Sequence, residues 1–371
     1  MYVYYTGNVK LEDGDFDYIN TGRESNTVLV VSEDGKTFGS KKELMRNVDY
    51  PSDLTCHVRD PKVWKDGDIY YMIQGARTKE DVGQALIFES KDKINWKFRS
   101  RVESEKPFGY MWECPDLFEM DGQLYIICCP QGVETQGIDY ENVHQVTAMK
   151  LDYDFDTDKY EITDIKLFDR GFDFYAPQSF EDESGRRILI GWMGIPDADY
   201  TNPTEEAGWQ HALTIPRELS VRDGKLIQEP IEELKQLRSE DKAVCTFCYG
   251  QTIIMQNAIY EAVVDFKRCR EMVMTLREGI TLSYKDNILT LNLGVYGSGR
   301  STRKVRLEKL EHLQIFADTS SLEIFVNHGE EVFTTRIYNR HGRILINGEC
   351  SGIMTVYPLK SFEIEGGRNE E

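Results

Sequence analysis

Short runs of alternating apolar and polar residues, separated by turn residues, fill the first 220 positions and predict β-strands. The clearest run occurs twice, as DPKVWKDGDIYYMIQGA over residues 60–76 and as PDLFEMDGQLYIICCP over 115–130. In both, an apolar run, an Asp-Gly pair and a second apolar run follow a proline, which predicts a β-hairpin. A looser copy runs from Ala176 to Trp192, with its turn at 183–185.

The repeat has a period that is typical of a four-stranded blade. Its anchoring prolines, Pro61, Pro115 and Pro177, are 54 and 62 residues apart. A second motif, S-x-D-x-x-x-[W/F], occurs at 32–38 and again at 90–96. Repetition of one hairpin unit at this spacing predicts an all-β chain that begins with a β-propeller.

The chain begins inside a copy of the repeat. Residues 2–7 (YVYYTG) align with residues 70–75 (YYMIQG), which form the second half of a copy. We therefore expect that sequence upstream is missing and that the propeller is incomplete at its N-terminus. The alternative is a naturally short first blade that another strand closes.

The pattern changes near residue 220. Residues 223–242 predict a turn, a proline and a short charged helix, which we interpret as a linker. Short strands with turn signals follow, at 251–260, 280–284, 288–295, 304–310, 313–317, 322–326, 332–336 and 353–358. They predict a β-sandwich over 243–371 after a propeller over 1–222. The sandwich carries no cluster of acids or histidines, so we expect a structural or oligomeric role for it.

Charge and composition narrow the choice of partners. The 371 residues include 64 acidic and 44 basic side chains, a net charge of −20. This balance disfavours nucleic acid and anionic membranes as partners. No apolar run reaches 18 residues, so we expect no membrane span.

The eight cysteines have irregular spacing, and Cys128 and Cys129 are adjacent within a predicted strand. A secreted disulfide framework is therefore not expected, and buried thiols in a reducing cytoplasm fit better. The Cys245-x-x-Cys248 pair has no second pair or histidine nearby, so we expect no metal site there.

Two acids occupy matching places in the repeat. Glu113 lies between Trp112 and Cys114, just before a proline, and Asp60 follows Arg59 at the equivalent place one copy earlier. Two carboxyl groups that converge on one cleft are what carboxylate-based sugar hydrolysis needs. Apolar neighbours would raise the pKa of Glu113, as a general acid requires. The alternative is a solvated glutamate on an edge strand.

Arg59 is expected to pair with Asp60 and keep it ionised, which suits hydroxyl binding or stabilisation of a developing cation. A purely structural Arg-Asp pair is the alternative. Tyr175, Gln178 and Trp192 begin or end strands of the third copy, where aromatic faces and amides can stack on and hydrogen-bond a sugar. Taken alone, each of them is more typical of the core.

These motifs together resemble glycoside hydrolase family 32, the group of invertases, levanases and sucrose-6-phosphate hydrolases. Residues 59–61 match the family's RDP motif and 113–114 its EC motif, while FYAPQ (174–178) and GWMG (191–194) match further stretches. The segment 191–219 looks most like the bacterial sucrose-6-phosphate hydrolases. The resemblance implies a five-bladed propeller joined to a β-sandwich.

The resemblance also implies chemistry, namely cleavage of β-fructofuranosides with retention through a fructosyl-enzyme intermediate. It assigns Glu113 as acid/base and Asp60 as transition-state stabiliser, with Arg59 beside it. Cys114, Tyr175, Gln178 and Trp192 are carried over as substrate-binding residues. This chemistry needs no cofactor and no metal.

One element of the family pattern is missing, because no Asn-Asp-Pro occurs in the sequence. The family's nucleophile is the aspartate of that motif. Three hypotheses follow: an N-terminally incomplete enzyme that is inactive or crippled as this chain alone, an inactive sugar-binding propeller, or a part that needs a separate first-blade chain or an oligomer. The sequence does not separate sucrose from sucrose 6-phosphate or fructans, since a phosphate preference needs basic residues that only coordinates can place.

Overall fold

The structure is a computed structural model that describes residues 1–250, 258–339, 342 and 344–361. Strands and four short 3-10 helices make up its regular structure over these residues, so the all-β prediction is confirmed. None of the helices in the described part is long and apolar enough to cross a membrane. The chain divides into two compact units, of which the first holds residues 1–168, 174–179 and 195–198 and the second holds the others.

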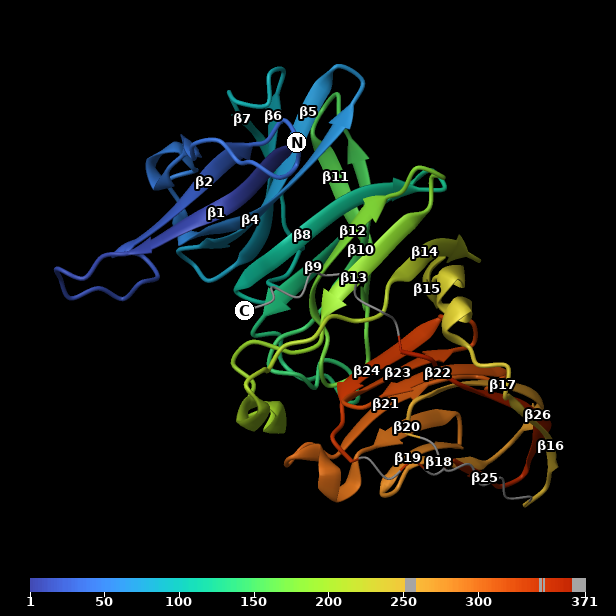
Figure 1. Cartoon of the computed structure of the whole chain (residues 1–371). Helices are drawn as coiled ribbons and strands as arrows, with labels where there is room; N and C mark the ends of the chain where they lie inside the picture. The colour runs from blue at the N-terminus through green and yellow to red at the C-terminus, as the bar shows by residue number, and fades with distance from the viewer. Residues whose placement is uncertain (251–257, 340–341, 343, 362–371) are drawn as a thin grey trace. The chain divides into compact units, whose positions relative to one another are not determined.

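The first unit contains three antiparallel sheets in chain order (Figure 1). Their orders are β1-β2-β3, β4-β5-β6-β7 and β11-β10-β9-β8, so each strand pairs with the next one along the chain. The strands are β1 (Tyr2–Lys10), β2 (Arg23–Val31), β3 (Lys42–Met45), β4 (Leu54–Asp66), β5 (Ile69–Thr78), β6 (Gly83–Ser90), β7 (Lys97–Val102), β8 (Met111–Met120), β9 (Gln123–Gln131), β10 (Thr147–Asp154) and β11 (Lys159–Leu167). A 3-10 helix, η1 (Asn47–Asp49), follows β3.

These sheets are propeller-like, since each is a meander of three or four strands. Strand β12 (Tyr175–Glu181) begins a fourth sheet, in the order β12-β13-β14-β15. Closure of the sheets into a ring is not detected over the described residues. The five-bladed arrangement therefore stays a prediction.

The predicted hairpins form at the repeated Asp-Gly pairs. Strands β8 and β9 are joined by Asp121 and Gly122, both with positive φ (51° and 76°), as a tight two-residue hairpin turn requires. The equivalent turn between β4 and β5 is formed one residue later, by Gly67 and Asp68. The third copy turns at 182–186, around its predicted position.

Apolar side chains of β5, β6, β8, β9 and β10 form one core cluster that includes Ile73, Ile87, Trp112, Ile126 and Met149. Strand β8 approaches β5 so closely that a Cβ atom on Gly75 would lie 1.7 Å from the carbonyl oxygen of Trp112. Glycine is therefore required at position 75, because any side chain there would prevent β8 from packing against β5. This packing places Glu113 of β8 beside the β4–β5 hairpin.

The three anchoring prolines share a backbone irregularity. The residue before each of them has a positive φ, namely Asp60 (63°), Cys114 (50°) and Ala176 (48°). Such values are uncommon for residues other than glycine and cost free energy. In β4 and in β8 the strand register shifts at this place, as in a β-bulge. The repeat predicted from sequence therefore extends to the backbone conformation of these strands.

The second unit contains β13 (Arg187–Trp192), β14 (Arg217–Arg222) and β15 (Lys225–Pro230), which pair as antiparallel neighbours. Two 3-10 helices lie in the connections, η2 (Pro203–Ala207) and η3 (Glu232–Leu237). Part of the segment interpreted as a linker is thus the strand β15, and the predicted charged helix is the short η3. The predicted domain boundaries at 222 and 242 stay a prediction.

Two further sheets follow, with the orders β16-β26-β17-β22-β23-β24 and β21-β20-β19-β18-β25. Their strands are β16 (Ala243–Cys248), β17 (Tyr260–Cys269), β18 (Met272–Arg277), β19 (Ile280–Lys285), β20 (Ile288–Asn292), β21 (Thr302–Arg306), β22 (His312–Asp318), β23 (Ser321–Val326), β24 (Glu331–Arg336), β25 (Leu345–Asn347) and β26 (Cys350–Pro358), with η4 (Gly294–Gly297) after β20. One core cluster unites both sheets, through residues such as Val264, Ile315 and Val356 from the first and Leu282 and Leu289 from the second. This is the packing of a β-sandwich.

Five predicted strands, at 280–284, 313–317, 322–326, 332–336 and 353–358, coincide with observed ones. The strand predicted at 288–295 ends at Asn292, and the one predicted at 304–310 ends at Arg306. Of the strand predicted at 251–260, residues 251–257 lie outside the described residues. Strands β16, β18 and β25 were not predicted.

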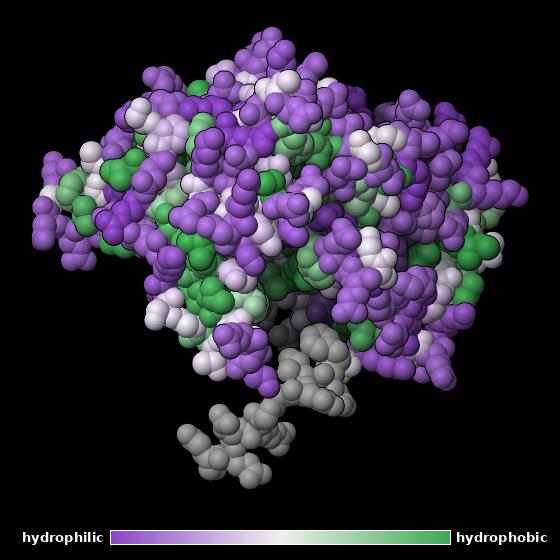
Figure 2. Space-filling model, turned by 90° about the horizontal axis from the view of Figure 1, so that it is seen from above, coloured by the Kyte–Doolittle hydropathy of each residue, from purple (hydrophilic) through white to green (hydrophobic). Residues whose placement is uncertain are grey.

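All eight cysteines are free thiols. Cys56, Cys128, Cys129 and Cys350 are buried as expected, but Cys248 is exposed, so the prediction of buried thiols is wrong at that position. The face of the molecule in Figure 2 is mostly hydrophilic, in keeping with the net charge of −20.

Candidate functional site

Strands β4, β8 and β12 each contribute residues at the same offsets from their proline. The first layer is formed by the residues two positions before the proline, Arg59, Glu113 and Tyr175. The second layer is formed by the residues one position before it, Asp60, Cys114 and Ala176. The third layer is formed by the residues one position after it, Lys62, Asp116 and Gln178. In each layer the β4 and β8 members contact one another, so the repeat register generates the site.

The first layer surrounds the carboxylate of Glu113. Arg59 donates from Nε and Nη2 to Oε1 of Glu113, at 2.9 and 2.7 Å, and the hydroxyl of Tyr175 donates to Oε2 at 2.7 Å. Arg59 also contacts Nδ1 of His57 through Nη1, at 2.7 Å. The Arg59 and Glu113 side chains are 14% and 16% exposed, so the ion pair is largely shielded from water.

Two expectations about these residues are wrong. Arg59 pairs with Glu113 and not with its neighbour Asp60. The partners of Glu113 are a guanidinium and a phenol, whereas Met111 and Trp112, the expected apolar neighbours, are fully buried in the core. These residues lie next to the bulge-like register shift before each proline, so the order along the chain does not determine which side chains meet.

The second layer holds Asp60. Its Oδ2 accepts the backbone N–H of Cys114 at 2.9 Å and lies 3.6 Å from the Cys114 thiol. The backbone N–H of Asp60 donates to Oγ1 of Thr6, in β1, at 2.9 Å. Burial raises the pKa of Asp60, while the N–H of Cys114 and the charge of Arg59 oppose that rise.

Neutral hydrogen-bond donors lie next to both acids. The pKa of the Cys114 thiol is raised by its contact with Cys129 and by burial. Burial also raises the pKa of Tyr175, which is 2% exposed. Both groups therefore keep their protons at neutral pH and act as donors to the carboxylates.

The third layer contains residues that the sequence did not single out. Lys62 Nζ lies 3.2 Å from Oδ1 of the buried Asp116 and donates to Oε1 of Gln178 at 3.3 Å. Oδ2 of Asp116 accepts the N–H of Ser179 at 2.6 Å, and Nε2 of Gln178 donates to the carbonyl of Cys114 at 3.1 Å. Lys62 and Asp116 could have been found from the sequence, because each directly follows the proline of its copy of the repeat, as Gln178 does.

The structure thus brings six candidate residues into one hydrogen-bonded network of the first unit: Arg59, Asp60, Glu113, Cys114, Tyr175 and Gln178. Trp192 belongs to the second unit, where its indole ring packs edge-on against His211 with centroids 5.4 Å apart. Its role in binding stays a prediction. Nowhere in the described residues do three or more His, Cys, Asp or Glu side chains gather as metal ligands would.

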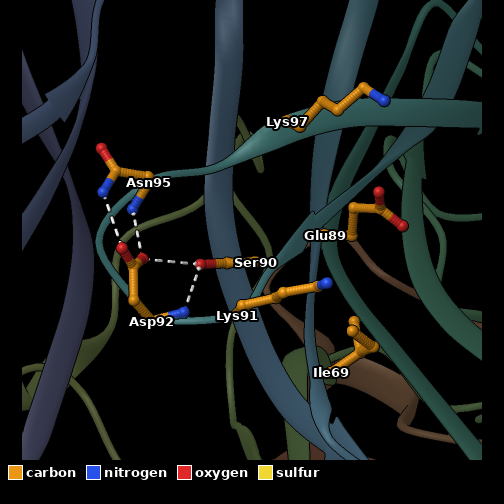
Figure 3. Close-up of a pocket in the computed structure, with 7 residues that line it drawn as sticks. All are labelled: Ile69, Glu89, Ser90, Lys91, Asp92, Asn95 and Lys97. Atoms are coloured by element: carbon orange, nitrogen blue, oxygen red, sulfur yellow. Dashed lines mark hydrogen bonds between the residues drawn. The ribbon is translucent and has the colours of Figure 1, made fainter.

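A separate pocket of about 250 Å³ lies at the β6–β7 turn (Figure 3). It is lined by Ile69, Glu89, Ser90, Lys91, Asp92, Asn95 and Lys97, none of which is a predicted site residue. Asp92 accepts hydrogen bonds from the backbone N–H groups of Ile94 and Asn95, at 2.9 and 2.7 Å. Asp92 therefore shapes the turn, and Asp34 does the same in the other copy of the S-x-D motif, where it accepts the N–H groups of Lys36 and Thr37.

Comparison with known proteins identifies the family of the chain. The model of the glycosyl hydrolases family 32 N-terminal domain matches residues 1–230, and that of the family 32 C-terminal domain matches residues 241–356. A sucrose-6-phosphate hydrolase of Bacillus subtilis is 36% identical over 365 residues, which cover 95% of this chain and 74% of that protein.

Two solved structures are also similar. That of a sucrose-6-phosphate hydrolase from Lactobacillus gasseri has a TM-score of 0.85 at 25% identity, and covers 97% of this chain and 76% of its own. A mutant Bombyx mori beta-fructofuranosidase in complex with sucrose has a TM-score of 0.82 at 29% identity, with the same coverage. The chain thus spans about three quarters of these relatives, and the predicted glycoside hydrolase of the sucrose-6-phosphate hydrolase type is confirmed. On both family models and on its relatives, the chain belongs to glycosyl hydrolase family 32.

Proposed function

We propose that this protein hydrolyses the glycosidic bond of sucrose 6-phosphate or sucrose with retention of configuration, using Glu113 as acid/base and Asp60 as transition-state stabiliser. The observation that carries the proposal is the Glu113 carboxyl group, held between Arg59 and Tyr175 in the layer next to Asp60. Family membership supports it, as does the similarity to a beta-fructofuranosidase that was crystallised with sucrose.

The contacts around Glu113 fix the position of a carboxyl group on both of its oxygens. In retaining hydrolysis one carboxyl group protonates the leaving oxygen and then, as a carboxylate, activates water. Arg59 holds Oε1 and Tyr175 holds Oε2, which fixes the orientation of the carboxyl group through both steps. Removal of such a group lowers a rate by about 10²–10⁴-fold.

Asp60 is placed to act as an acceptor. Its Oδ2 is held by the N–H of Cys114, so the orientation of its carboxylate is fixed by the backbone of β8. A carboxylate held in this way can accept hydroxyl groups of the fructose ring and stabilise the developing oxocarbenium charge. Cys114 and Gln178 extend the polar surface around it.

We further infer that the nucleophile comes from outside these 371 residues, either from an upstream segment that completes a five-bladed propeller or from a separate chain. Support comes from the sequence, which contains no Asn-Asp-Pro. Asp17, an acid of the loop after β1, is not a substitute, because its Oδ1 accepts the N–H groups of Ile19, Asn20 and Thr21. An inactive sugar-binding protein is the second candidate, and the same missing motif favours it.

The test is release of glucose and fructose from sucrose and sucrose 6-phosphate by the purified chain and by Glu113→Gln. Glu89→Gln is the matched control, since Glu89 also pairs with an arginine of the first unit, Arg99, at 2.9 Å. Hydrolysis that Glu113→Gln abolishes and Glu89→Gln leaves intact supports the acid/base role and shows that a nucleophile exists within the chain. Equal hydrolysis by all three proteins would rule out Glu113 as the acid/base.

A chain that binds sucrose by calorimetry and hydrolyses neither sugar would instead point to an incomplete or inactive site. In that case binding should weaken in Asp60→Asn. Location in the cytoplasm is likewise our proposal, supported by eight cysteines that are all free thiols.

A further inference from the structure

One face of the β1–β2 hairpin is polar over the half that leads to the hairpin's loop. These antiparallel strands pair without a register shift, and directly opposite residues place their side chains on the same face. The polar pairs on this face are Thr6 with Thr27, Asn8 with Ser25, and Lys10 with Arg23. The other half of the face carries Tyr2 with Val31 and Tyr4 with Leu29. A sheet face in a protein core is normally apolar, so three successive polar pairs indicate a polar neighbour over this half of the face.

The neighbour is β4, the strand that carries Arg59 and Asp60. Oγ1 of Thr6 accepts the N–H of Asp60, and Oγ of Ser25 donates to the carbonyl of Cys56 at 2.6 Å. Burial and the charge of Arg59 both lower the pKa of Arg23, so the two guanidinium groups are close enough to repel one another. The polar face therefore runs from Asp60 at one end to Arg23 and Lys10 at the other.

Arg23 and Lys10 lack anionic partners. Within the described part of the chain neither side chain forms an ion pair, and the buried Nε of Arg23 has no hydrogen-bond partner. Lys10 lies over the ring of Tyr18, 5.2 Å from its centroid. Like charges directly opposite one another destabilise a strand pair. Two such cations, unpaired in a chain with 64 acidic residues, indicate a site that an anion fills.

The guanidinium of arginine fits a phosphoryl group better than other cations do, because its planar fork binds two oxygens at once. Four residues separate Thr6 from Lys10, which corresponds to about 13 Å along a strand. A disaccharide held by its fructose ring at Asp60 would therefore reach toward Arg23 with its other sugar.

We propose that Arg23, assisted by Lys10, binds the phosphoryl group of a phosphorylated disaccharide whose fructose ring lies at Asp60. This inference rests on the proposed function and deepens it, since it selects sucrose 6-phosphate over sucrose. It also explains how a strongly acidic protein attracts a substrate of the same sign of charge.

The test is isothermal titration of sucrose 6-phosphate, sucrose and inorganic phosphate into the wild-type chain and into Arg23→Gln, Arg23→Lys and Lys10→Gln. We expect wild type to bind sucrose 6-phosphate at least about tenfold more tightly than sucrose, as one charge-assisted contact implies. Arg23→Gln should remove that advantage and leave the affinity for sucrose unchanged. Arg23→Lys should retain part of it.

Arg46→Gln is the matched control, because Arg46 is an exposed arginine of the same unit that pairs with Glu43. The thermal midpoint of Arg23→Gln without ligand checks folding; it should equal or exceed that of wild type, because a repulsive charge is removed. The inference is overturned if Arg23→Gln weakens both sugars equally, if it weakens neither, or if sucrose 6-phosphate does not bind. Arg23-dependent binding without hydrolysis would overturn the proposed hydrolase activity and leave the phosphoryl site standing.

Discussion

Replacement of Arg217 by methionine tests how the second unit tolerates buried charge. Arg217 begins β14 and is fully buried. Its Nη1 lies 3.2 Å from Oδ2 of Asp169 and donates to Gln228 at 2.9 Å, while its Nη2 donates to Glu323 at 2.7 Å and to Thr334 at 2.6 Å. Methionine fills a similar volume but leaves both buried carboxylates without their cation.

The cost follows from the burial of the two acids. Desolvation raises the pKa of both Asp169 and Glu323, and Arg217 opposes the rise in each case. Removing one partner from a buried ion pair costs about 3–5 kcal/mol. For a unit of this size, each kcal/mol lowers the thermal midpoint by about 2–4 °C, so we expect a fall of about 6–20 °C at neutral pH.

The fall should depend on pH. A carboxyl group whose folded pKa is raised above its unfolded value binds protons more readily in the folded state, so its unfavourable effect on stability lessens as pH falls. In Arg217→Met the two acids can accept protons and lose their charge. We therefore expect a smaller difference from wild type at pH 5 than at pH 8.

The assay is differential scanning calorimetry of both proteins at the two pH values. Arg270→Met is the control, because Arg270 pairs with Glu349 through side chains that are 75% and 58% exposed, and such surface pairs contribute about 0–1 kcal/mol. A midpoint within about 2 °C of wild type at pH 8 would refute the estimate. An equal fall at both pH values would refute the role of the carboxylates.

Two further predictions concern the strands of the site. Ala176 has a φ of 48°, so Ala176→Gly should raise the free energy of unfolding by about 1 kcal/mol in urea titrations, and a decrease would show that the alanine side chain contributes packing that outweighs the strain. Burial and the charges of Arg59 and Arg23 lower the pKa of His57 to about 4 from the usual 6.5, so its contribution to stability is present above pH 6.5 and is lost as pH falls toward 4. His57→Gln should therefore flatten the decline of the thermal midpoint across that window, and an unchanged slope would argue against a neutral, buried His57.

The repeat allowed much of the site to be predicted from the sequence. Because Pro61, Pro115 and Pro177 mark equivalent places, Glu113 and Asp60 could be placed near each other before any coordinates. The expected match between the two acids was off by one residue, since Arg59 is the residue equivalent to Glu113. The side-chain partners could not be predicted, since the interpretation paired residues that are adjacent in sequence. The bulge-like shift before Pro61 changes where these side chains point, so Arg59 of β4 contacts Glu113 of β8 and not Asp60 beside it.

The failure to predict strand β16 has a physical explanation. Strand β16 lies at the edge of its sheet, and four of its six residues are exposed. A strand that is largely solvated carries little of the alternating apolar pattern on which the prediction depends. Arg23 was not predicted as a site residue for a different reason. Its proposed role rests on the lack of an anionic partner in the folded chain, which a sequence pattern does not show.

The three layers of the site lie within four residues of the same strands, and this has a consequence for how the site can vary. A substitution changes one member of one layer. An insertion or deletion of a single residue between Leu54 and Pro61 would shift the register of β4 against β5. Arg59, Asp60 and the strained backbone before the proline would then all be displaced together. Natural or laboratory variants of this protein should therefore differ at the site by point changes, while length variation accumulates in the turns beyond the strands.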